Sequence, residues 1–563
     1  MVHARAAAPP PNWRARVQAL LQSRFRLRQL RPGQEEVIRH VLAGEDTLAL
    51  MATGAGKSLC YQVPALLLPG RTVVISPLIA LMKDQHDHLR ALGIPVVLRH
   101  SGQLAAENEK AAQAMADGSA RIVFTTPERL ASPGFAQELG AHPVSLLVID
   151  EAHCIAEWGH DFRPAFLEIG AALRKLGRPV VLALTATATP EDVADVMRQL
   201  DLADMQVVHT GLYRGNLHYA VDHVESEAAQ RARLLTLVHG TPGQGIVYTS
   251  TVKAAEAVHA ELQSSGESVA LYHGHLARGR RHAAQDAFMA GEARVMVATP
   301  AFGMGIDKAD TRFVIHHQLP ASLASYYQAS GRAGRDGLPA RCTLLYLAQD
   351  RRIQQFFLIG RLPTVADLRA VHDQLGEEAA EAAGWRLPEL EAVLARPRQK
   401  VQLAVWLMRR HGLLARDRHG VLRRRVDTLA DEALAPLLEE HAQRKQHDLA
   451  MLENLVAYCQ SGRCRWQMLL QHFDPDEPFS PCGHCDNCER LAAAQQQADQ
   501  QAADSSLEAP PPADDLPRIQ VGDAVRVPRY GRGHVLAIDD VGITVGFPNG
   551  PDRSFLPRYV RPA

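Results

Sequence analysis

The residues most able to do chemistry in this 563-residue chain begin with the segment Thr53–Leu59. It follows an apolar run, Thr47–Met51, that predicts a buried strand, and it opens a predicted helix. Glycines in such a loop let backbone N–H groups turn onto phosphate oxygens at a helix N-terminus, where the dipole favours an anion. A lysine adds charge at the β- and γ-phosphates, and a hydroxyl can bind Mg²⁺. The residues predicted to hold the phosphates are Thr53, Gly54, Gly56, Lys57 and Ser58.

A second reactive segment, Asp150-Glu151-Ala152-His153, ends another apolar run about ninety residues later. A carboxylate at this place can hold Mg²⁺ together with Ser58, and its neighbour can activate a water. The two segments together predict a nucleoside triphosphate hydrolase that uses Mg²⁺, with Asp150 as metal ligand. The alternative is a glycine-rich turn and an unrelated acidic strand end.

Two arginines, Arg332 and Arg335, lie three apart in the glycine-containing segment Gln328–Arg335, at a predicted helix start. An arginine that reaches a γ-phosphate from a second domain stabilises charge in phosphoryl transfer, so domain closure and hydrolysis become linked. The alternative is that both are solvated helix residues. The residues predicted to act in catalysis are therefore Lys57, Asp150, Glu151, Arg332 and Arg335.

Composition sets wide bounds on the class of protein. Hydrophobic residues make up 46% and charged residues 22%, and the formal net charge is −1, so any nucleic-acid surface must be local. No apolar run approaches the length that spans a membrane, and Met1–Asn12 has no signal-peptide core. Of the 8 cysteines, five fall between Cys459 and Cys488, which favours a metal site in a reducing cytosol. We therefore expect a cytoplasmic protein, associated with the nucleoid if it is bacterial.

Short apolar strands alternate with amphipathic helices from about Phe25 to Tyr346, the pattern of α/β domains with parallel sheets. Arg214–Val224 is interpreted as the crossing between two such domains. Gln495–Pro512 lacks core-forming periodicity and predicts a flexible linker. The predicted segments are 1–24, a leader and N-terminal helix; 25–213 and 214–350, the α/β domains; 351–436, a basic winged-helix-like domain; 437–490, a helical hairpin and zinc module; 491–517, the linker; and 518–563, a small β-barrel.

Four cysteines in the 437–490 segment have gaps of 17, 2 and 2 residues: Cys464, Cys482, Cys485 and Cys488. Thiolate pairs two residues apart bind a tetrahedral ion well, and four thiolates close the shell of a structural zinc site. An iron–sulfur cluster and unligated thiols are the alternatives. Cys459 and His484 are interpreted as bystanders.

The segment Arg396–Arg425 contains ten Lys or Arg and one acid, Asp417. Val401–His411 has helical periodicity, and a turn near His419-Gly420 predicts a basic hairpin. A helix followed by a basic hairpin is typical of a winged helix, and we expect Arg423 and Arg424 to contact DNA. The alternative is a solvated arginine-rich surface.

The chain closely resembles superfamily 2 helicases, and within them the RecQ family. The resemblance rests on Arg31–Glu36, on Ser76–Gln85 and above all on Cys154–Pro164, which is similar to the aromatic-rich loop of RecQ enzymes. It covers roughly 25–346 and returns at 464–488. It implies two RecA-like domains and a helicase that uses ATP to move 3′ to 5′ along single-stranded DNA, in recombination or repair. The alternatives are a DNA translocase or remodelling ATPase with little unwinding, and a DNA-junction recruitment protein with an ATP switch.

The resemblance also implies roles for single residues. Gln34 would read the adenine edge, Glu151 would be the general base, and Trp158 and Phe162 would sense single-stranded DNA. The expected nucleotide site then adds Arg31, Gln34 and Gln328, and the expected DNA site is Trp158, His160, Phe162, Arg163, Arg423 and Arg424. RecQ proteins usually carry the winged helix after the zinc module, whereas here it precedes it.

The C-terminal segment 518–563 shows short Val-rich alternations broken by Gly and Pro, which predict an SH3- or Tudor-like barrel. It resembles the small barrel that ends UvrD-type helicases, which in that family docks on RNA polymerase. We therefore expect a tethered module that contacts RNA polymerase or a repair protein. Its seven Arg against four Asp equally permit weak DNA binding.

Overall fold

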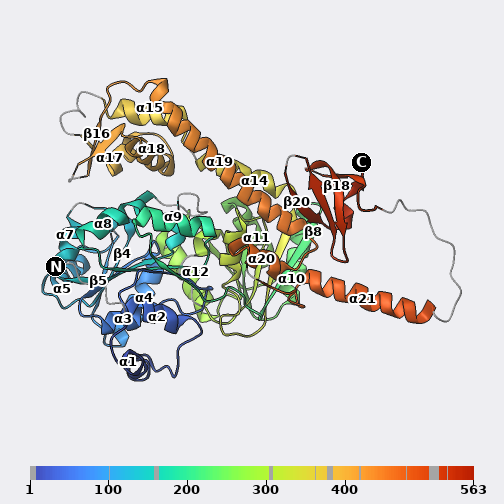
Figure 1. Ribbon diagram of the computed structural model, residues 1–563, viewed down its shortest axis with the longest axis horizontal. Helices are drawn as coiled ribbons and strands as arrows, with labels where there is room; N and C mark the ends of the chain where they lie inside the picture. Colours follow the sequence, from blue (N-terminus) through green and yellow to red (C-terminus); the bar gives the residue numbers. More distant parts are fainter. Residues whose placement is uncertain are drawn as a thin grey trace. The chain divides into compact units, whose positions relative to one another are not determined.

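The computed structural model describes residues 8–100, 102–132, 134–156, 164–303, 308–361, 363–376, 384–417, 420–476, 478–505, 519–528, 530–548 and 550–563 (Figure 1). The chain forms two compact units. The first unit consists chiefly of residues up to 212 together with 355–449, and the second of 213–302, 308–354 and 450–563. Among the described helices, none combines the length and the apolar character needed to cross a bilayer.

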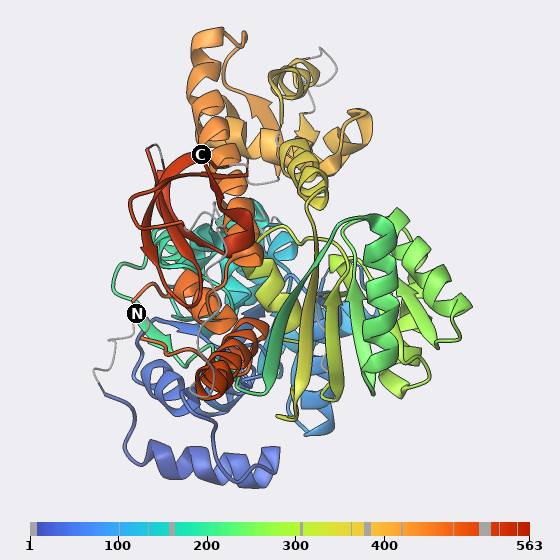
Figure 2. The same ribbon diagram turned by 90° about the vertical axis from the view of Figure 1, so that its right-hand side faces the viewer.

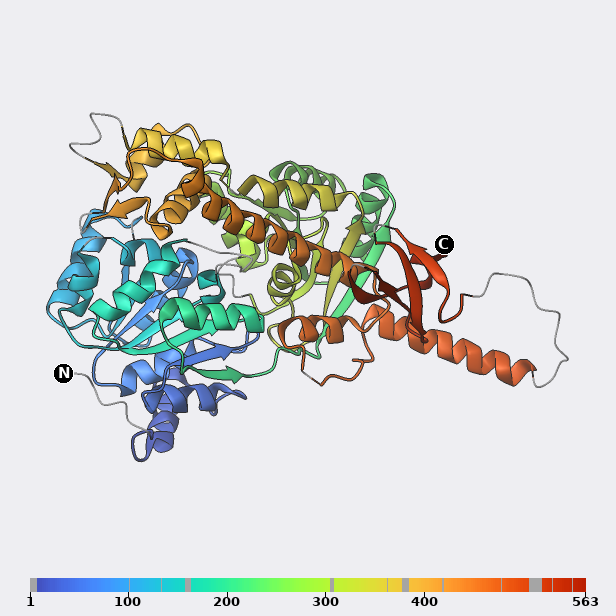
Figure 3. The ribbon, with the colours of Figure 1, turned by 45° about the horizontal axis from the view of Figure 1, so that its top comes forward.

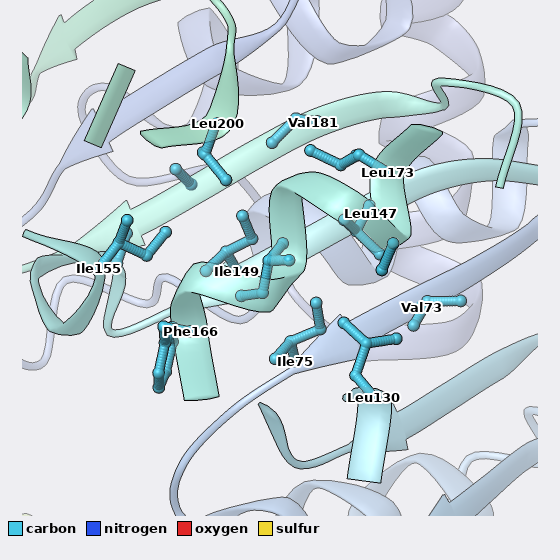
Figure 4. Close-up of a cluster of buried hydrophobic side chains, with 14 of the residues drawn as sticks. Val73, Ile75, Leu130, Leu147, Ile149, Ile155, Phe166, Leu173, Val181 and Leu200 are labelled. Carbon is cyan, nitrogen blue, oxygen red and sulfur yellow. The ribbon is translucent and has the colours of Figure 1, made fainter. Parts of the chain in front are cut away.

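The first unit carries a seven-stranded parallel sheet. Its strands are β1 (Thr47–Leu50), β2 (Arg71–Ile75), β3 (Val96–Arg99), β4 (Ile122–Thr125), β5 (Val144–Asp150), β6 (Val180–Thr185) and β7 (Gln206–His209). They lie in the order β3-β4-β2-β5-β6-β1-β7. Helices cover both faces, so the central strands are buried on both sides, which is why they have continuous apolar sequences. Figure 4 shows one face, where Ile75 and Leu147 of the sheet pack near Phe166.

The helices around this sheet position its loops. They are α1 (Trp13–Leu20), η1 (Leu21–Phe25), α2 (Gln34–Leu42), α3 (Leu59–Leu67), α4 (Ile79–Ala91), α5 (Ala105–Ala116), α6 (Pro127–Leu130), α7 (Phe135–Gly140), η2 (Ala152–Ile155), η3 (Pro164–Glu168), α8 (Ile169–Lys175) and α9 (Pro190–Leu200). The predicted phosphate loop joins β1 to α3, and the predicted acidic pair ends β5. Because β5, β6 and β1 are neighbours and parallel, their carboxyl ends share one edge of the sheet.

The second unit carries a six-stranded parallel sheet, seen in green and yellow-green in Figure 2. Its strands are β8 (Leu217–Val224), β9 (Gln244–Tyr248), β10 (Val269–Tyr272), β11 (Val295–Ala298), β12 (Thr311–His316) and β13 (Ala340–Leu347), in the order β10-β11-β9-β12-β13-β8. Its helices are α10 (Glu227–Gly240), α11 (Val252–Ser264), α12 (Arg278–Ala290), η4 (Pro300–Gly303) and α13 (Leu323–Ser330). The interpretation of Arg214–Val224 as a crossing is therefore wrong for most of its length. Residues 217–224 form edge strand β8, paired with β13 along eight registered residues.

The basic segment folds as a small helical domain with a three-stranded sheet. Its elements are α14 (Asp350–Arg361), α15 (Val365–Gln374), β14 (Trp385–Arg386), α17 (Leu387–Val393), α18 (Arg398–Arg410), β15 (Leu414–Arg416) and β16 (Val421–Arg424). The predicted helix and the predicted hairpin are both confirmed, and β15 and β16 are antiparallel. Leu390, Leu407 and Leu422 belong to its own apolar core.

The C-terminal part begins with α19 (Asp431–Gln460), a single helix of 30 residues, followed by α20 (Arg465–Phe473) and α21 (Asp486–Ser505) (Figure 3). Within the predicted segment 437–490 we expected the helical hairpin to occupy Leu437–Cys464, and that placement is wrong. The hairpin is made by α19 and α20, because Leu437–Gln460 contains no Gly or Pro and the first break is Ser461-Gly462. The predicted linker is also helical as far as Ser505, since its Ala and Gln are good helix formers. Residues 506–518 lie outside the described part.

The C-terminal segment forms a five-stranded antiparallel sheet in the order β20-β19-β18-β17-β21. Its elements are β17 (Ala524–Val527), β18 (Gly531–Ile538), β19 (Ile543–Phe547), β20 (Gly550–Phe555), η5 (Pro557–Tyr559) and β21 (Arg561–Pro562). Its core holds Val525, Val535, Val545 and Phe555. The strands form in the Val-rich alternations of the sequence, because alternation of buried Val with exposed residues has the period of a strand.

Candidate active site

The phosphate loop between β1 and α3 depends on two glycines. Gly54 and Gly56 have φ of +85° and +83°, the left-handed region that residues with a Cβ rarely adopt. A Cβ at Gly56 would also lie 2.6 Å from Gln34 Nε2. The loop carries its predicted ligands to the N-terminus of α3, where Thr53, Lys57 and Ser58 are all half-buried.

Gln34 and Arg31 fasten this loop through its carbonyl oxygens. Gln34 Nε2 donates to Ala55 O at 3.1 Å and to Gly56 O at 2.9 Å, and Gln34 Oε1 accepts from Arg31 N at 2.8 Å. Arg31 also donates to Gly54 O. Gln34 is only 1% exposed, and both of its amide hydrogens are used. The structure therefore gives Gln34 a part in holding the loop, and its reading of adenine stays a prediction.

Asp150 stands at the end of β5 beside Ser76, which follows β2. Ser76 Oγ donates to Asp150 Oδ2 at 3.2 Å. The pKa of Asp150 is raised to about 6, mainly by burial and then by the charge of Glu151, while the charge of Lys57 opposes both. A buried carboxylate that is short of positive charge suits Mg²⁺, and Asp150 and Ser58 are the residues that would hold it. Ser76 belongs to the segment Ser76–Gln85 on which the RecQ resemblance rests, but its contact with Asp150 was not predicted.

Glu151 is held in an uncommon backbone conformation, with φ of +54°. Such strain in a residue with a side chain persists only where its surroundings enforce it, and it gathers at active sites. Its buried Oε2 lies 3.4 Å from His153 Nδ1 and makes no hydrogen bond to a described residue. His153 Nδ1 in turn lies 3.0 Å from Thr185 Oγ1, which donates to Thr187 O at 3.2 Å. His153 thus joins the acidic segment to the end of β6, a role that sequence reasoning missed although it quoted all four residues.

Arg332 is buried in the second unit, just beyond α13. It is 7% exposed and forms no ion pair with any described residue. Burial raises the pKa of Tyr248, and the charges of Arg332 and Arg335 oppose that shift, so both guanidinium groups lie near this ring. Burying a guanidinium without a counter-charge is costly, and an anionic ligand would offset that cost. This arrangement fits a phosphate, whereas a solvated helix residue would be exposed. Gln328 lies half-buried on α13.

Arg214 and Asn216 hold the turn that carries these two arginines. Arg214 donates from Nη1 to Gly331 O at 2.8 Å, and from Nη2 to Ala333 O at 2.8 Å and to Gly334 O at 2.5 Å. Asn216 Nδ2 donates to Gly334 O at 2.8 Å. Gly334 has φ of +55°, and a Cβ there would lie 2.5 Å from Asn216 Nδ2. The sequence around Arg214 does not predict this role, because the carbonyl groups that it contacts lie more than a hundred residues further along the chain.

The residues predicted to contact DNA divide into two groups. Trp158, His160, Phe162 and Arg163 lie outside the described residues. On the hairpin, Arg423 of β16 is exposed, and Arg424 is half-buried and donates to Asp427 O at 3.3 Å. Of these two, Arg423 is the more accessible to a phosphate.

Much of the positive charge of 396–425 is paired within the protein. Arg409 and Arg416 lie 2.7 Å and 3.8 Å from Glu168, which closes η3 of the same unit. Ion pairs to described acids are made by at least five of the ten basic residues: Arg396, Arg398, Lys400, Arg409 and Arg416. The dense positive charge of this segment therefore serves internal contacts as much as it could serve DNA.

The four predicted zinc ligands come together. The Sγ atoms of Cys464, Cys482, Cys485 and Cys488 all lie within 4.8 Å of one another, and those of Cys482 and Cys488 are 3.9 Å apart. Four sulfurs about 2.3 Å from a tetrahedral zinc would be about 3.8 Å apart, so the cluster fits that ion. Cys459 and His484 are not part of the cluster, as predicted.

The zinc module is fixed to the edge of the second sheet by a buried arginine and a tryptophan. Arg465 donates from Nε to Asp486 Oδ1 at 2.8 Å and from Nη2 to Oδ2 at 3.0 Å. Asp486 Oδ2 also accepts from Val221 N of β8 at 3.0 Å. Trp466 Nε1 donates to Leu217 O at 3.1 Å. Burial alone would lower the pKa of Arg465, but Asp486 raises it well above its usual range, so the pair is charged.

Comparison with known proteins agrees with this arrangement. Residues 31–196 match the DEAD/DEAH box helicase family, residues 229–337 match the helicase conserved C-terminal domain, and residues 422–489 match the RecQ zinc-binding family. The chain is 36% identical over 481 residues to the ATP-dependent DNA helicase RecQ of Bacillus subtilis, covering 85% of this chain and 68% of that protein. It is 34% identical to the probable ATP-dependent DNA helicase RecS of the same organism, covering 84% of this chain and 92% of that one.

Solved structures resemble the chain in fold. The DUF1998 helicase MrfA bound to DNA and AMPPNP aligns with a TM-score of 0.52 at 20% identity, over 76% of this chain and 64% of that one. Dbp5 of S. cerevisiae bound to RNA and ADP BeF3 aligns with a TM-score of 0.50 at 18% identity, over 62% and 92%. At these identities the likeness concerns the two-sheet fold alone.

Proposed function

Because the chain belongs to the RecQ family of ATP-dependent DNA helicases, we propose that it moves 3′ to 5′ along single-stranded DNA and separates duplex or branched DNA in recombination or repair. The direction and the pathway rest on the family resemblance. The observation that carries the proposal is the strained Glu151, whose buried carboxylate oxygen makes no hydrogen bond to a described residue and lies 3.4 Å from His153, which in turn contacts Thr185. The contacts of His153 thus connect Glu151, the proposed general base, to Thr185 at the end of β6.

In the proposed reaction each residue has a distinct task. Lys57 and the loop amides bind the β- and γ-phosphates, and Glu151 Oε2 takes a proton from the attacking water. Asp150 and Ser58 would hold Mg²⁺, which neutralises charge on the phosphate oxygens when bound. Arg332 stabilises charge on the transferred phosphoryl group. Hydrolysis then depends on both α/β domains, as a motor that converts ATP into movement requires.

Strand-separation assays on 3′-tailed, 5′-tailed and forked duplexes test the proposal, with Glu151→Gln as the inactive control. We expect unwinding of 3′-tailed and forked DNA, and none of 5′-tailed DNA. Rapid hydrolysis without strand displacement would instead indicate a translocase or remodelling ATPase. Tight binding with very slow turnover would indicate a recruitment protein with an ATP switch. Preference for the 5′ tail would refute the direction.

We also propose that Arg423 of the basic hairpin contacts a DNA phosphate. The exposed position of Arg423 supports this. Arg423→Ala should weaken duplex binding and reduce the slope of log K against log salt by about 0.9, the value for one phosphate contact. Arg398→Ala is the matched control, since Arg398 is exposed but paired with Glu391. Equal slopes in the wild type and Arg423→Ala would show that Arg423 makes no phosphate contact and would refute this proposal.

A protein contact through the C-terminal barrel, with RNA polymerase or a repair protein, stays a proposal. Leu536 and Ile538 support it, because these apolar side chains are 48% and 44% exposed on β18. Leu536→Ser should reduce co-purification of RNA polymerase without changing unwinding of naked DNA. Unchanged co-purification would remove this face from the proposal.

A further inference from the structure

The C-terminal barrel is packed against the second helicase domain, in place of the free tether that its preceding segment predicted. Tyr559 donates its hydroxyl to His223 Nδ1 at 2.5 Å, and His223 Nε2 donates to Cys459 O at 3.0 Å. Since a carbonyl only accepts, the proton must be on Nε2, which leaves Nδ1 to accept from the tyrosine. The barrel lies beside the C-terminal end of α19 in Figures 1 and 3, where Leu556 N donates to Gln460 O at 3.4 Å.

Gly462 makes this contact close. A Cβ at Gly462 would lie 1.9 Å from Val541 O and 2.8 Å from Leu556 Cδ2 of the barrel. Only a glycine lets the turn after α19 approach the barrel backbone to this distance. The position of the barrel on the second unit is therefore built into the turn that precedes Cys464, the first zinc ligand.

Three arginines form a row across the docked barrel. Arg526 of β17 is directly opposite Arg532 of β18 on one side and Arg561 of β21 on the other. Residues directly opposite on neighbouring strands point to the same face, so all three side chains share one face of the sheet. All three are exposed.

This row is unfavourable for the barrel alone. Like charges directly opposite each other destabilise a strand pair, and none of the three arginines makes an ion pair with a described residue. Two of the barrel's four aspartates accept hydrogen bonds from backbone N–H groups. Asp523 accepts from Gln520 N at 2.7 Å, and Asp539 accepts from Val541 N and Gly542 N at 2.9 Å and 2.8 Å. The charge of the row is thus left for a ligand outside the barrel.

We propose that this arginine row, Arg561-Arg526-Arg532, binds the phosphate backbone of DNA and makes the barrel a second DNA grip on the second helicase domain. Neighbouring strands are about 4.8 Å apart, so three strands spread the charges over about 10 Å. A DNA strand carries a phosphate about every 3.4 Å of helix axis, so it presents about three charges over that length. The inference goes beyond the proposed function, which places DNA contacts in the first unit only.

The regularly spaced positive charges of the row match the regularly spaced negative charges of a nucleic-acid backbone. Contacts to the backbone hold a strand without reading its sequence. Because the barrel is fixed on the second domain through His223 and Gly462, a strand held by the row would move with that domain. The grip would then add affinity without touching the ATP site. Its effect should appear in DNA binding and in the DNA concentration needed to stimulate ATPase, with turnover at saturating DNA unchanged.

The test uses the full chain and a fluorescent single-stranded oligonucleotide, with no other protein present. The triple variant Arg526→Gln, Arg532→Gln, Arg561→Gln should reduce the slope of log K against log salt by about 2, since each single-strand phosphate contact contributes about 0.7. The charge-matched control changes three exposed, ion-paired arginines of the α/β domains to Gln: Arg178, Arg198 and Arg233. It should leave the slope unchanged.

Two further variants separate binding from folding. Replacing the same three arginines by lysine should restore the slope, because lysine also binds phosphate as a point charge. Arg526→Gln alone should reduce the slope by about 0.7 with little risk to the barrel fold. A triple variant with the wild-type slope, or a control triple with the same loss, would overturn the proposal. If the slope is unchanged but a protein partner is lost, the row is a protein contact and the proposal is equally refuted. Failed 3′-to-5′ unwinding would not affect this binding result, so the two proposals fail separately.

Discussion

Replacing Arg214 by alanine should slow ATP hydrolysis by loosening the turn that carries Arg332. Its guanidinium supplies three hydrogen bonds to the carbonyls of Gly331, Ala333 and Gly334, which frame Arg332. An arginine that stabilises phosphoryl transfer is worth about 10³ to 10⁵ in turnover, and a misplacement of 1 Å costs about 10²-fold. Loosening the turn should therefore lower kcat by about 10²-fold. KM for ATP should change little, because the lost interaction belongs to the transition state.

The assay is DNA-stimulated ATP hydrolysis at saturating single-stranded DNA, measured for Arg214→Ala, Arg332→Ala and the double variant. If Arg214 acts by positioning Arg332, the double variant should turn over no more slowly than Arg332→Ala alone. The coupling free energy between Arg214 and Arg332 would then equal the whole effect of Arg214→Ala on the activation free energy, about 2.7 kcal/mol for a 10²-fold change in kcat. Arg233→Ala is the control, since Arg233 is exposed and pairs with Asp222 at 2.6 Å on the same unit.

Two results would refute this reasoning. If the losses of Arg214→Ala and Arg332→Ala multiply in the double variant, Arg214 acts by another route than the turn. If Arg214→Ala keeps wild-type kcat, the carbonyl contacts do not position the arginine. The midpoint of thermal unfolding and the zinc content of each variant must match those of the wild type, because general destabilisation would lower activity without any coupling.

Three further outcomes follow from the structure. Glu151→Gln should keep ATP binding and lower turnover by about 10² to 10⁴, the usual worth of a general base, and substantial ATPase in the purified variant would remove Glu151 from that role. Cys485→Ser should lose zinc, measured by metal analysis, whereas Cys342→Ala, a buried thiol outside the cluster, should keep it; retention in Cys485→Ser would contradict the ligand assignment. Burial, together with the charges of Arg558 and Arg465, lowers the pKa of His223 from 6.5 to about 4. The folded chain therefore favours the neutral ring, and the free energy of unfolding carries a contribution from His223 that is complete above pH 6.5 and is lost as pH falls toward 4. Between pH 7 and pH 5 the free energy of unfolding should fall by about 2 kcal/mol because of His223. Urea denaturation measures this loss, which should be absent in His223→Asn.

The chemical centres were predictable because their residues are close in sequence. Gly54, Gly56 and Lys57 stand within four positions, and a strand before them and a helix after them suffice to define a phosphate loop. Asp150 and Glu151 are adjacent, and the spacing of the last three zinc ligands already limits how they can meet. Continuous apolar runs likewise predicted the buried parallel strands, since both faces of such strands are covered.

Other features were mispredicted because they depend on what a segment packs against. Residues 217–224 were interpreted as a crossing, yet pairing with β13 makes them a strand. The Gln- and Ala-rich residues after Gln495 lack an apolar face, but their helix propensity is enough to extend α21. Charge count alone also could not show that Arg409 of the basic segment 396–425 pairs with Glu168, which is far away in sequence; whether the segment binds DNA stays a prediction.

By itself the sequence determined which groups could hold phosphate, metal and zinc, because covalent spacing and local backbone preference place them. Tertiary structure alone decided that Arg214 reaches the turn of Arg332, that Gly462 admits the barrel, and that Arg526 lies between two other arginines. These contacts join residues separated by long stretches of chain. Strand register and close packing bring them together, and neither is written in the spacing of neighbouring residues.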